Sequence, residues 1–209
     1  METFDYKTAY KHLYLPSAKE PSLVEVPPMK FAMVDGQGDP NTSQAFQDAI
    51  GALYGVTYTI KMLPKKKIVP PGYVIYNIPP LEGLWWLENG KPFSFDVPKD
   101  DYRWTVMIMQ PAFVTQELVD KAVEDQFKKK GNPAFNILRF EEFGEGKAVQ
   151  IMHIGPYGDE PASLAKMEEF ADRQGYRFHG KHHEIYLRDP RRTKPQKLRT
   201  VLRYAVAPK

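Results

Sequence analysis

The sequence predicts an α+β fold of two pseudo-symmetric β-α-β-β modules with antiparallel strands, helices on the outer side and a ligand groove at the module interface. Three observations support this prediction. The order strand, helix, strand, strand occurs twice, at about residues 29–110 and 147–206. Apolar residues recur at helical spacing in the predicted helices, and short alternating segments between proline and glycine turns predict the strands. The 209 residues can bury a large core without cross-links, and the chain contains no cysteine.

Composition excludes several classes of function. Without cysteine the chain has no disulfide, no thiolate metal site and no cysteine nucleophile. The 29 basic and 26 acidic residues leave a net charge of only +3, and they are spread along the chain, so a nucleic-acid partner is not expected. Neither a signal peptide nor a long apolar run is present, so we expect a cytoplasmic protein that does not contact membranes.

The first 28 residues are predicted to be an arm that packs on the body, and residues 29–209 to be one domain. A strand, a helix and two strands make up the first module. The helix has Asn41 or Thr42 as its cap, and an apolar stripe that includes Phe46 and Leu53. The extended region that follows it is interrupted by Pro79 and Pro80, which predicts a bulge or two short strands. The predicted strands of this module lie at residues 29–34, 73–86 and 102–110.

A helix at residues 115–130 is predicted to link the two modules, and a short strand-like piece follows at 135–140. The second module begins with a strand and the turn at residues 155–158. A helix comes next, with Asp159 as its cap and Gly175 as its end. The strands of this module are predicted at residues 147–154, 181–187 and 198–206. Where two such modules meet, a ligand groove is expected.

Four motifs, taken together and in their order, resemble the GyrI-like small-molecule-binding family over about residues 27–207. They are PLEGLWW at residues 80–86, WTVMIMQP at 104–111, GPY at 155–157 and HHEIYLRDPRR at 182–192. The resemblance implies a relative of the effector-binding domains of multidrug-sensing regulators, which bind bulky, flat and often cationic compounds. No DNA-binding segment is visible in the sequence, so we expect a stand-alone version rather than a regulator. Some stand-alone members are similar to hydrolases that open the cyclopropane ring of DNA-alkylating natural products in an aromatic cage.

Glu184 is the main candidate for a catalytic residue. Strand alternation places it on one face with His182 and Tyr186, while Ile185 and Leu187 point to the other face. In an apolar pocket its carboxylate would pair with a cationic ligand or act as a general acid or base. The alternative is a solvent-facing residue on an edge strand.

The tryptophans are candidates for the walls of the groove, although large aromatic residues also fill cores. Trp104 shares a strand face with Tyr102, so this strand can supply one aromatic wall. Trp85 and Trp86 must point in opposite directions, so one of the two is expected to face the pocket. Glu82 occupies about the place in the first module that Glu184 has in the second. It is either a second carboxylate of the groove or part of a salt bridge.

Tyr157 follows a Gly-Pro turn at the entrance of a helix. It either covers the edge of the core or, as the family motif suggests, orients a water molecule or donates to a substrate carbonyl.

A metal site is a weaker interpretation of the histidine-rich strand. His179, His182, His183 and Glu184 are residues of the types that bind zinc. Adjacent residues of a strand diverge, however, so His182 and Glu184 can share a face while His183 cannot, and the sequence shows no further ligand cluster. We therefore expect neither a metal nor a cofactor.

Two functions use these same residues. In the first, the protein is a hydrolase that holds a strained electrophile among aromatic side chains while Glu184 takes a proton from water. In the second, it binds flat or cationic xenobiotics without turnover. Docking onto a protein such as a topoisomerase follows only from the family name, and the sequence indicates no protein partner.

Overall fold

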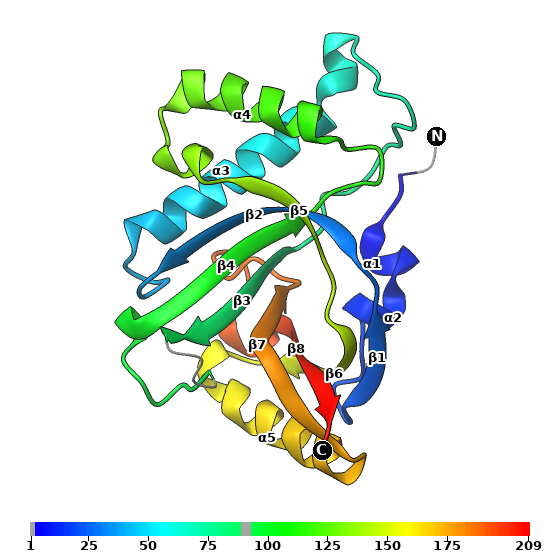
Figure 1. The fold of residues 1–209 in the computed structure, drawn as a ribbon, viewed down its shortest axis with the longest axis vertical. Coiled ribbons are helices and arrows are strands. Elements are labelled where there is room, and N and C mark those ends of the chain that lie inside the picture. The colour runs from blue at the N-terminus through cyan, green and yellow to red at the C-terminus, as the bar shows by residue number, and fades with distance from the viewer. Residues whose placement is uncertain (1–2, 89–92) are drawn as a thin grey trace.

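The computed structural model describes residues 3–88 and 93–209, whose strands form one antiparallel sheet with helices packed on it (Figure 1). The sheet has eight strands in the order β1-β6-β8-β7-β3-β4-β2-β5. The strands are β1 (Ser22–Val26), β2 (Met29–Gln37), β3 (Leu81–Leu87), β4 (Tyr102–Met109), β5 (Arg139–Phe143), β6 (Gly146–Ile154), β7 (Tyr176–Tyr186) and β8 (Arg199–Pro208). The α-helices are α1 (Tyr6–Ala9), α2 (Lys11–Tyr14), α3 (Gln44–Lys61), α4 (Gln116–Lys130) and α5 (Glu160–Arg173).

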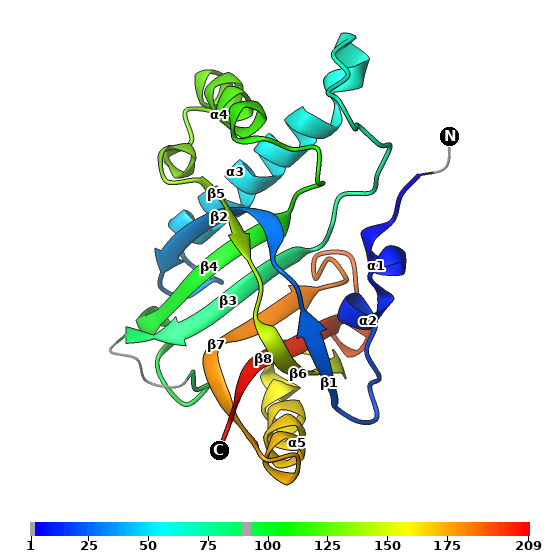
Figure 2. The ribbon, with the colours of Figure 1, turned by 45° about the vertical axis from the view of Figure 1, so that its right-hand side comes forward.

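The two predicted modules are β2-α3-β3-β4 and β6-α5-β7-β8. Equivalent strands of the two modules occupy equivalent places in the sheet. The second strands, β3 and β7, pair at its centre, the third strands, β4 and β8, lie next to them, and the first strands, β2 and β6, follow. The prediction of an α+β fold with two related antiparallel modules is therefore confirmed. Figure 2 shows how the two halves turn away from each other on either side of this central pair.

Local signals explain where the helices begin and end. The hydroxyl of Ser43, rather than Asn41 or Thr42, accepts a hydrogen bond from the backbone N–H of Phe46 and caps α3. Thr115 caps α4 in the same way, and Gly131 ends that helix in the left-handed conformation, with φ of 62°. Short 3-10 helices lie between these elements, at Leu63–Lys66, Lys99–Asp101, Pro133–Asn136, Tyr157–Asp159 and Pro195–Lys197.

The helices α3 and α5 cover the same face of the sheet. Residues directly opposite each other in an antiparallel pair point to the same side. Trp85, which packs with α3, lies opposite His182, and Glu184 lies opposite Leu202, which packs with α5. The face of β3 and β7 that bears Trp85 and Glu184 is called the helix face below. α4 packs outside α3 on the same side.

Some predicted boundaries differ from the structure. A regular strand begins only at Leu81, because the two prolines before it cannot donate hydrogen bonds to a neighbouring strand. Residues 133–136 form a 3-10 helix, and β5 begins at Arg139. Asp159 precedes α5, but its side chain makes no capping hydrogen bond. The arm contains the two short helices and also β1, which extends the sheet beside β6.

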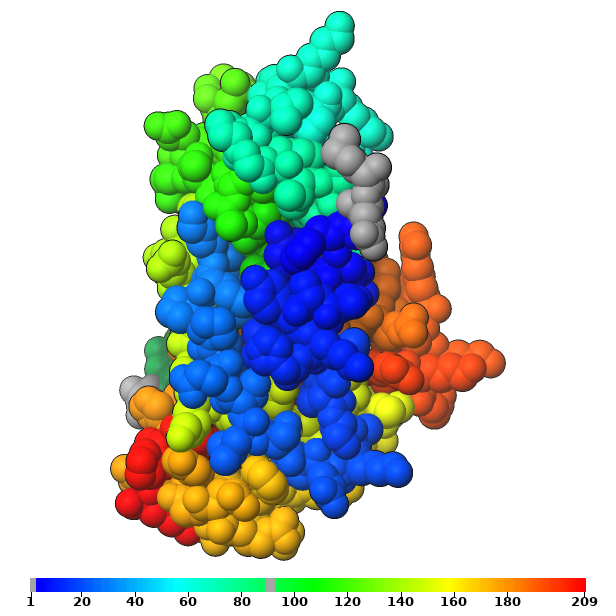
Figure 3. Space-filling model, turned by 90° about the vertical axis from the view of Figure 1, so that its right-hand side faces the viewer, coloured from blue at the N-terminus to red at the C-terminus, as the bar shows by residue number. Residues whose placement is uncertain are grey.

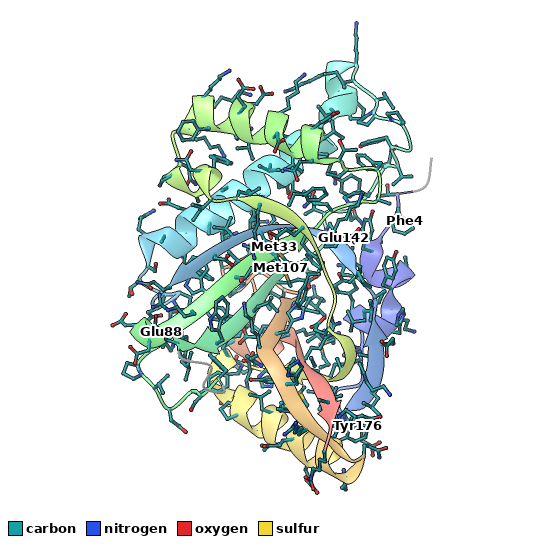
Figure 4. The ribbon with its side chains drawn as sticks, viewed as in Figure 1. Phe4, Met33, Glu88, Met107, Glu142 and Tyr176 are labelled. Atoms are coloured by element: carbon teal, nitrogen blue, oxygen red, sulfur yellow. The ribbon has the colours of Figure 1, made fainter. Side chains whose placement is uncertain are left out.

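The arm covers the other face of the sheet. Tyr6 packs there with Met33 and Met107, which are cross-strand partners in the interior (Figure 4). Leu13 and Tyr14 pack with residues of β6, β7 and β8. The arm is therefore part of the core. No helix in the described part of the chain is long and apolar enough to span a membrane.

A buried network of charges joins the arm to this face. The hydroxyl of Tyr14 donates to Glu82 at 3.0 Å, and the other oxygen of Glu82 is 3.0 Å from Nε2 of His183. Nδ1 of His183 lies 2.5 Å from Glu145, which Arg203 also approaches at 3.7 Å. Burial opposes a charge on His183, but Glu145 and Glu82 outweigh it and raise the pKa of His183 above its usual value. Burial likewise disfavours a charge on Glu145, yet His183 and Arg203 lower its pKa to about 2.

The tight contact between Gly36 and Trp104 predicts a large effect of one methyl group. A Cβ atom at Gly36 would lie 2.1 Å from the Trp104 ring, so Gly36→Ala should destabilise the protein by about 1–3 kcal/mol. In Gly51→Ala the new Cβ meets nothing closer than 3.5 Å and alanine favours the helix, so stability should hold or rise. Thermal unfolding measures both. Equal melting temperatures for the two variants would contradict the packing described here.

The buried network predicts how stability changes in acid. Because the pKa of Glu145 is lowered on folding, its contribution is complete above its ordinary value of 4.5 and is lost as pH falls toward 2. Glu145→Gln should cost about 3–5 kcal/mol near neutral pH, because it removes one of the two carboxylates that pair with buried His183. The variant should also lose less further stability than the parent between pH 5 and 3, measured by denaturant unfolding. The exposed Glu25→Gln is the control, and an acid dependence of Glu145→Gln equal to that of the parent would contradict the network.

Candidate functional site

The pairing of β3 with β7 brings the candidate residues together at the centre of the sheet. Gly83 lies opposite Glu184, Trp85 opposite His182 and Leu81 opposite Tyr186. All of these residues point to the helix face. The structure therefore places Glu184, His182 and Tyr186 on one face, as strand alternation predicts.

Glu184 is a buried carboxylate on a central strand. Its residue is only 7% exposed, which differs from the alternative of a solvent-facing group on an edge strand. Its Oε1 lies 3.1 Å from Nε2 of fully buried His182. Nδ1 of that histidine has no partner among the described residues.

A second buried carboxyl group, Glu160, lies beside Glu184. Glu160 is the first residue of α5 and is fully buried, and within the described part of the chain neither of its oxygens has a hydrogen-bond donor. Burial first, and then the charge of the neighbouring Glu184, raise the pKa of Glu160 well above its usual value. A proton on one of two carboxyl groups so placed removes the repulsion between their charges.

Tyrosines surround the two carboxyl groups. The rings of Tyr157 and Tyr186 meet edge to face, with centroids 5.9 Å apart. Nε1 of Trp85 donates to the hydroxyl of Tyr186 at 3.0 Å. Burial and the charge of Glu184 raise the pKa values of Tyr157, Tyr186 and Tyr204, so these hydroxyls stay protonated and can donate hydrogen bonds.

Gly83 makes the contact between Trp85 and Tyr186 possible. A Cβ atom at this position would lie 2.8 Å from Nε1 of Trp85 and 3.0 Å from the hydroxyl of Tyr186. The indole and the phenol therefore meet over the one position of the central pair that has no side chain. Any larger residue at this position would push them apart.

Two phenylalanines that sequence reasoning missed close one side of the site. Phe93 stacks on the ring of His182, with centroids 5.0 Å apart and planes at 13°, and Phe95 meets the same ring edge to face. Phe93 also contacts Tyr102 at 5.0 Å, and Tyr204 lies 5.3 Å from His182. Phe93 and Phe95 come from a loop without periodicity, so no pattern in the sequence indicated their place.

The structure separates the remaining candidates from this site. Trp86 points to the arm side, where Nζ of Lys181 lies 3.4 Å from the centre of its ring. Trp104 faces the helices but is fully buried in the core against Phe46. Glu82 lies on the opposite face from Glu184, in the network with His183, so the expectation of a second carboxylate in the groove differs from the structure. The second carboxyl group is that of Glu160.

Glu160, His182 and Glu184 also form a possible metal-binding set. Each offers one ligand atom, and these atoms lie within 4.8 Å of one another. The sequence analysis found no third ligand, because Glu160 belongs to α5 whereas His182 and Glu184 belong to β7. Both a shared proton and a divalent cation would relieve the repulsion between the carboxylates.

Two open cavities lie elsewhere on the molecule. One of about 310 Å³ is lined by residues that include Glu88 and Arg103, which form an ion pair (Figure 4). Another, of about 400 Å³, lies beside the arm and is lined by residues that include Phe4 and Glu142 (Figure 4). Neither is lined by Glu184 or Glu160.

Comparison with known proteins assigns the family. The sequence model of the GyrI-like small molecule binding domain matches residues 19–206, nearly the whole chain. The protein belongs to the GyrI-like family. Among curated proteins, none matches the chain.

Several solved structures of other proteins are similar to this chain. An uncharacterized conserved protein from Listeria innocua is 40% identical with a TM-score of 0.90, over 98% of this chain and all of that one. A protein described as a hydrolase from Listeria innocua is 38% identical with a TM-score of 0.87, over 98% of this chain and all of that one. The EcmrR C-terminal domain is 13% identical with a TM-score of 0.53, over 91% of this chain and 98% of that domain, and it shares the fold.

The two adjacent tryptophans of this GyrI-like chain provide a matched test of the site. Trp85 is on the helix face and Trp86 on the arm face. A planar polycyclic ligand should quench tryptophan fluorescence saturably in the parent and in Trp86→Phe, whereas Trp85→Phe should lose most of the quenching. Binding is confirmed independently by calorimetry. Equal quenching in both variants would show that the ligand binds away from the helix face.

Proposed function

We propose that this protein binds a bulky, flat electrophile on the helix face and hydrolyses it, with Glu184 as general base and Glu160 as general acid. The feature that supports this most is the buried pair of carboxyl groups among aromatic side chains, in which burial and the charge of Glu184 raise the pKa of Glu160. Two carboxyl groups whose environments separate their pKa values are a recurrent acid and base pair in enzymes. The similarity to a protein described as a hydrolase agrees with this class of reaction.

The substrate class that fits best is a cyclopropane conjugated to a carbonyl group, as the family resemblance suggests. Water attacks a ring carbon and gives its proton to Glu184. The strained carbon–carbon bond breaks, its electron pair moves to the carbonyl oxygen, and that oxygen takes the proton of Glu160. Water is thereby added across one bond, and a proton returns from Glu184 to Glu160 to restore the starting state.

The aromatic side chains have separate tasks in this reaction. Trp85 and Tyr186 support the flat ring system, while the hydroxyl of Tyr157 orients the carbonyl oxygen or the water. His182, 3.1 Å from Glu184, fixes the orientation of the base. Glu184 is 7% exposed, so a ligand reaches it only when surrounding side chains such as Phe93 move aside.

A second candidate function is binding without turnover. A carboxylate among aromatic rings also suits a flat cation, which gains from charge pairing and from the faces of the rings. A detoxifying role would follow from either function, by destruction or by sequestration of the compound. Mass spectrometry of a reactive cyclopropane incubated in ¹⁸O-labelled water separates the two, since only hydrolysis adds labelled oxygen faster than the reaction without protein.

The acid and base pair predicts distinct effects of two isosteric substitutions. Glu184→Gln and Glu160→Gln should each lower kcat on the order of a hundredfold or more, while ligand affinity changes little. Glu169→Gln, an exposed position of the same helix, is the control and should match the parent. Turnover is measured by quantifying the product in reactions quenched at set times. A Glu184→Gln protein that hydrolyses like the parent would remove Glu184 from the mechanism, and loss of affinity alone would favour pairing with a cation.

Removal of metals tests whether the two carboxyl groups share a proton or hold a cation during the reaction. Hydrolysis should continue unchanged after dialysis against EDTA, because the proposed steps need only a proton. Excess Zn²⁺ should inhibit, since it competes for the same carboxyl groups. Activity that vanishes with EDTA and returns with a divalent metal would contradict the proposal.

A further inference from the structure

The loop that joins β7 to β8 holds a concentration of positive charge. Residues 188–199, called the basic loop below, contain one acidic residue, Asp189, and six basic ones: Arg188, Arg191, Arg192, Lys194, Lys197 and Arg199. This segment has a formal charge of +5 whereas the whole chain has +3, so the remainder of the protein is net negative. The excess positive charge is thus local.

Backbone hydrogen bonds hold the ends of the basic loop close, along the chain, to two tyrosines of the Glu184 site. It starts two residues after Tyr186, and its base is closed by a hydrogen bond from the backbone N–H of Leu187 to the carbonyl of Arg199, at 3.0 Å. The N–H of Gly155, two residues before Tyr157, donates to the carbonyl of Leu198 at 3.2 Å. Tyr157 and Tyr186 are themselves in contact. The loop therefore borders the site, and Figure 3 shows it in orange to red, standing out from the body.

The cations of the loop face solvent. The side chains of Arg191 and Arg192 are 86% and 87% exposed, and all six basic residues are exposed. Asp189 pairs with Arg191 and, at 3.9 Å, with Arg192. Among the described residues the other four basic side chains make no ion pair.

We infer that the basic loop binds an anionic group on the ligand whose flat part lies on the helix face. This rests on the proposed function, because it assigns the outer end of the same ligand. Carboxylate, sulfonate and phosphate groups all match the planar, multiple donors of arginine. Each exposed pair contributes little by itself, so several together amount to roughly a tenfold gain in affinity that salt removes.

Two fluorescent probes of the same shape test the charge alone. 1-Anilinonaphthalene-8-sulfonate carries a sulfonate, and N-phenyl-1-naphthylamine has the same rings without it. The parent should bind the sulfonate on the order of tenfold more tightly at low salt, and the difference should nearly vanish at about 1 M salt, where the screening length is roughly 3 Å. The triple substitution Arg188→Gln, Arg191→Gln, Arg192→Gln should abolish the preference and leave the neutral probe unaffected.

The control removes the same charge elsewhere. Lys65, Lys66 and Lys67 are exposed and belong to the segment after α3, and their joint substitution by glutamine should retain the preference for the sulfonate. Equal affinity of the parent for both probes, or a preference that survives the triple arginine substitution, would overturn the inference. So would binding of duplex DNA through the loop without discrimination between the probes. A preference for the sulfonate in a protein without hydrolytic activity would uphold this inference and refute only the proposed reaction.

Discussion

The antiparallel pairing of β3 with β7 is the constraint on which the rest of the structure depends. This one ladder joins the two modules, and its register decides which residues face each other at the centre of the sheet. It sets Gly83 opposite Glu184, which leaves space above the glycine for Trp85 and Tyr186. A shift by one residue would turn Glu184 toward the arm.

The same ladder separates two kinds of buried charge. On the arm face, His183 meets Glu82 and Glu145 with opposite charge, and such a network holds structure together. On the helix face, the carboxyl groups of Glu160 and Glu184 lie together, and no lysine or arginine pairs with either among the described residues. Burial and the charge of Glu184 raise the pKa of Glu160, which suits the proton donor that we propose.

Strand alternation was sufficient to predict the shared face of His182, Glu184 and Tyr186, because the period of a strand is independent of its neighbours. The place of Glu82 was not predictable in this way, since it depends on the register between two distant strands. Glu160 was missed because a glutamate in the first turn of a helix ordinarily only favours the helix dipole. Its position next to the GPY motif was the one available signal. Whether Trp104 or Trp85 contacts the site depends on the packing of Phe46 and Phe93, which no periodicity encodes.

The most direct test of the central claim is the protonation state of Glu160. Isotope-edited infrared spectroscopy of protein with labelled glutamate detects the C=O stretch of a protonated carboxyl group separately from carboxylate bands. The account predicts such a band near neutral pH that disappears in Glu160→Gln and persists in the exposed Glu169→Gln. A spectrum that contains only carboxylate bands at pH 7 would show that both groups are ionised, and would contradict a shared proton as the basis of the site.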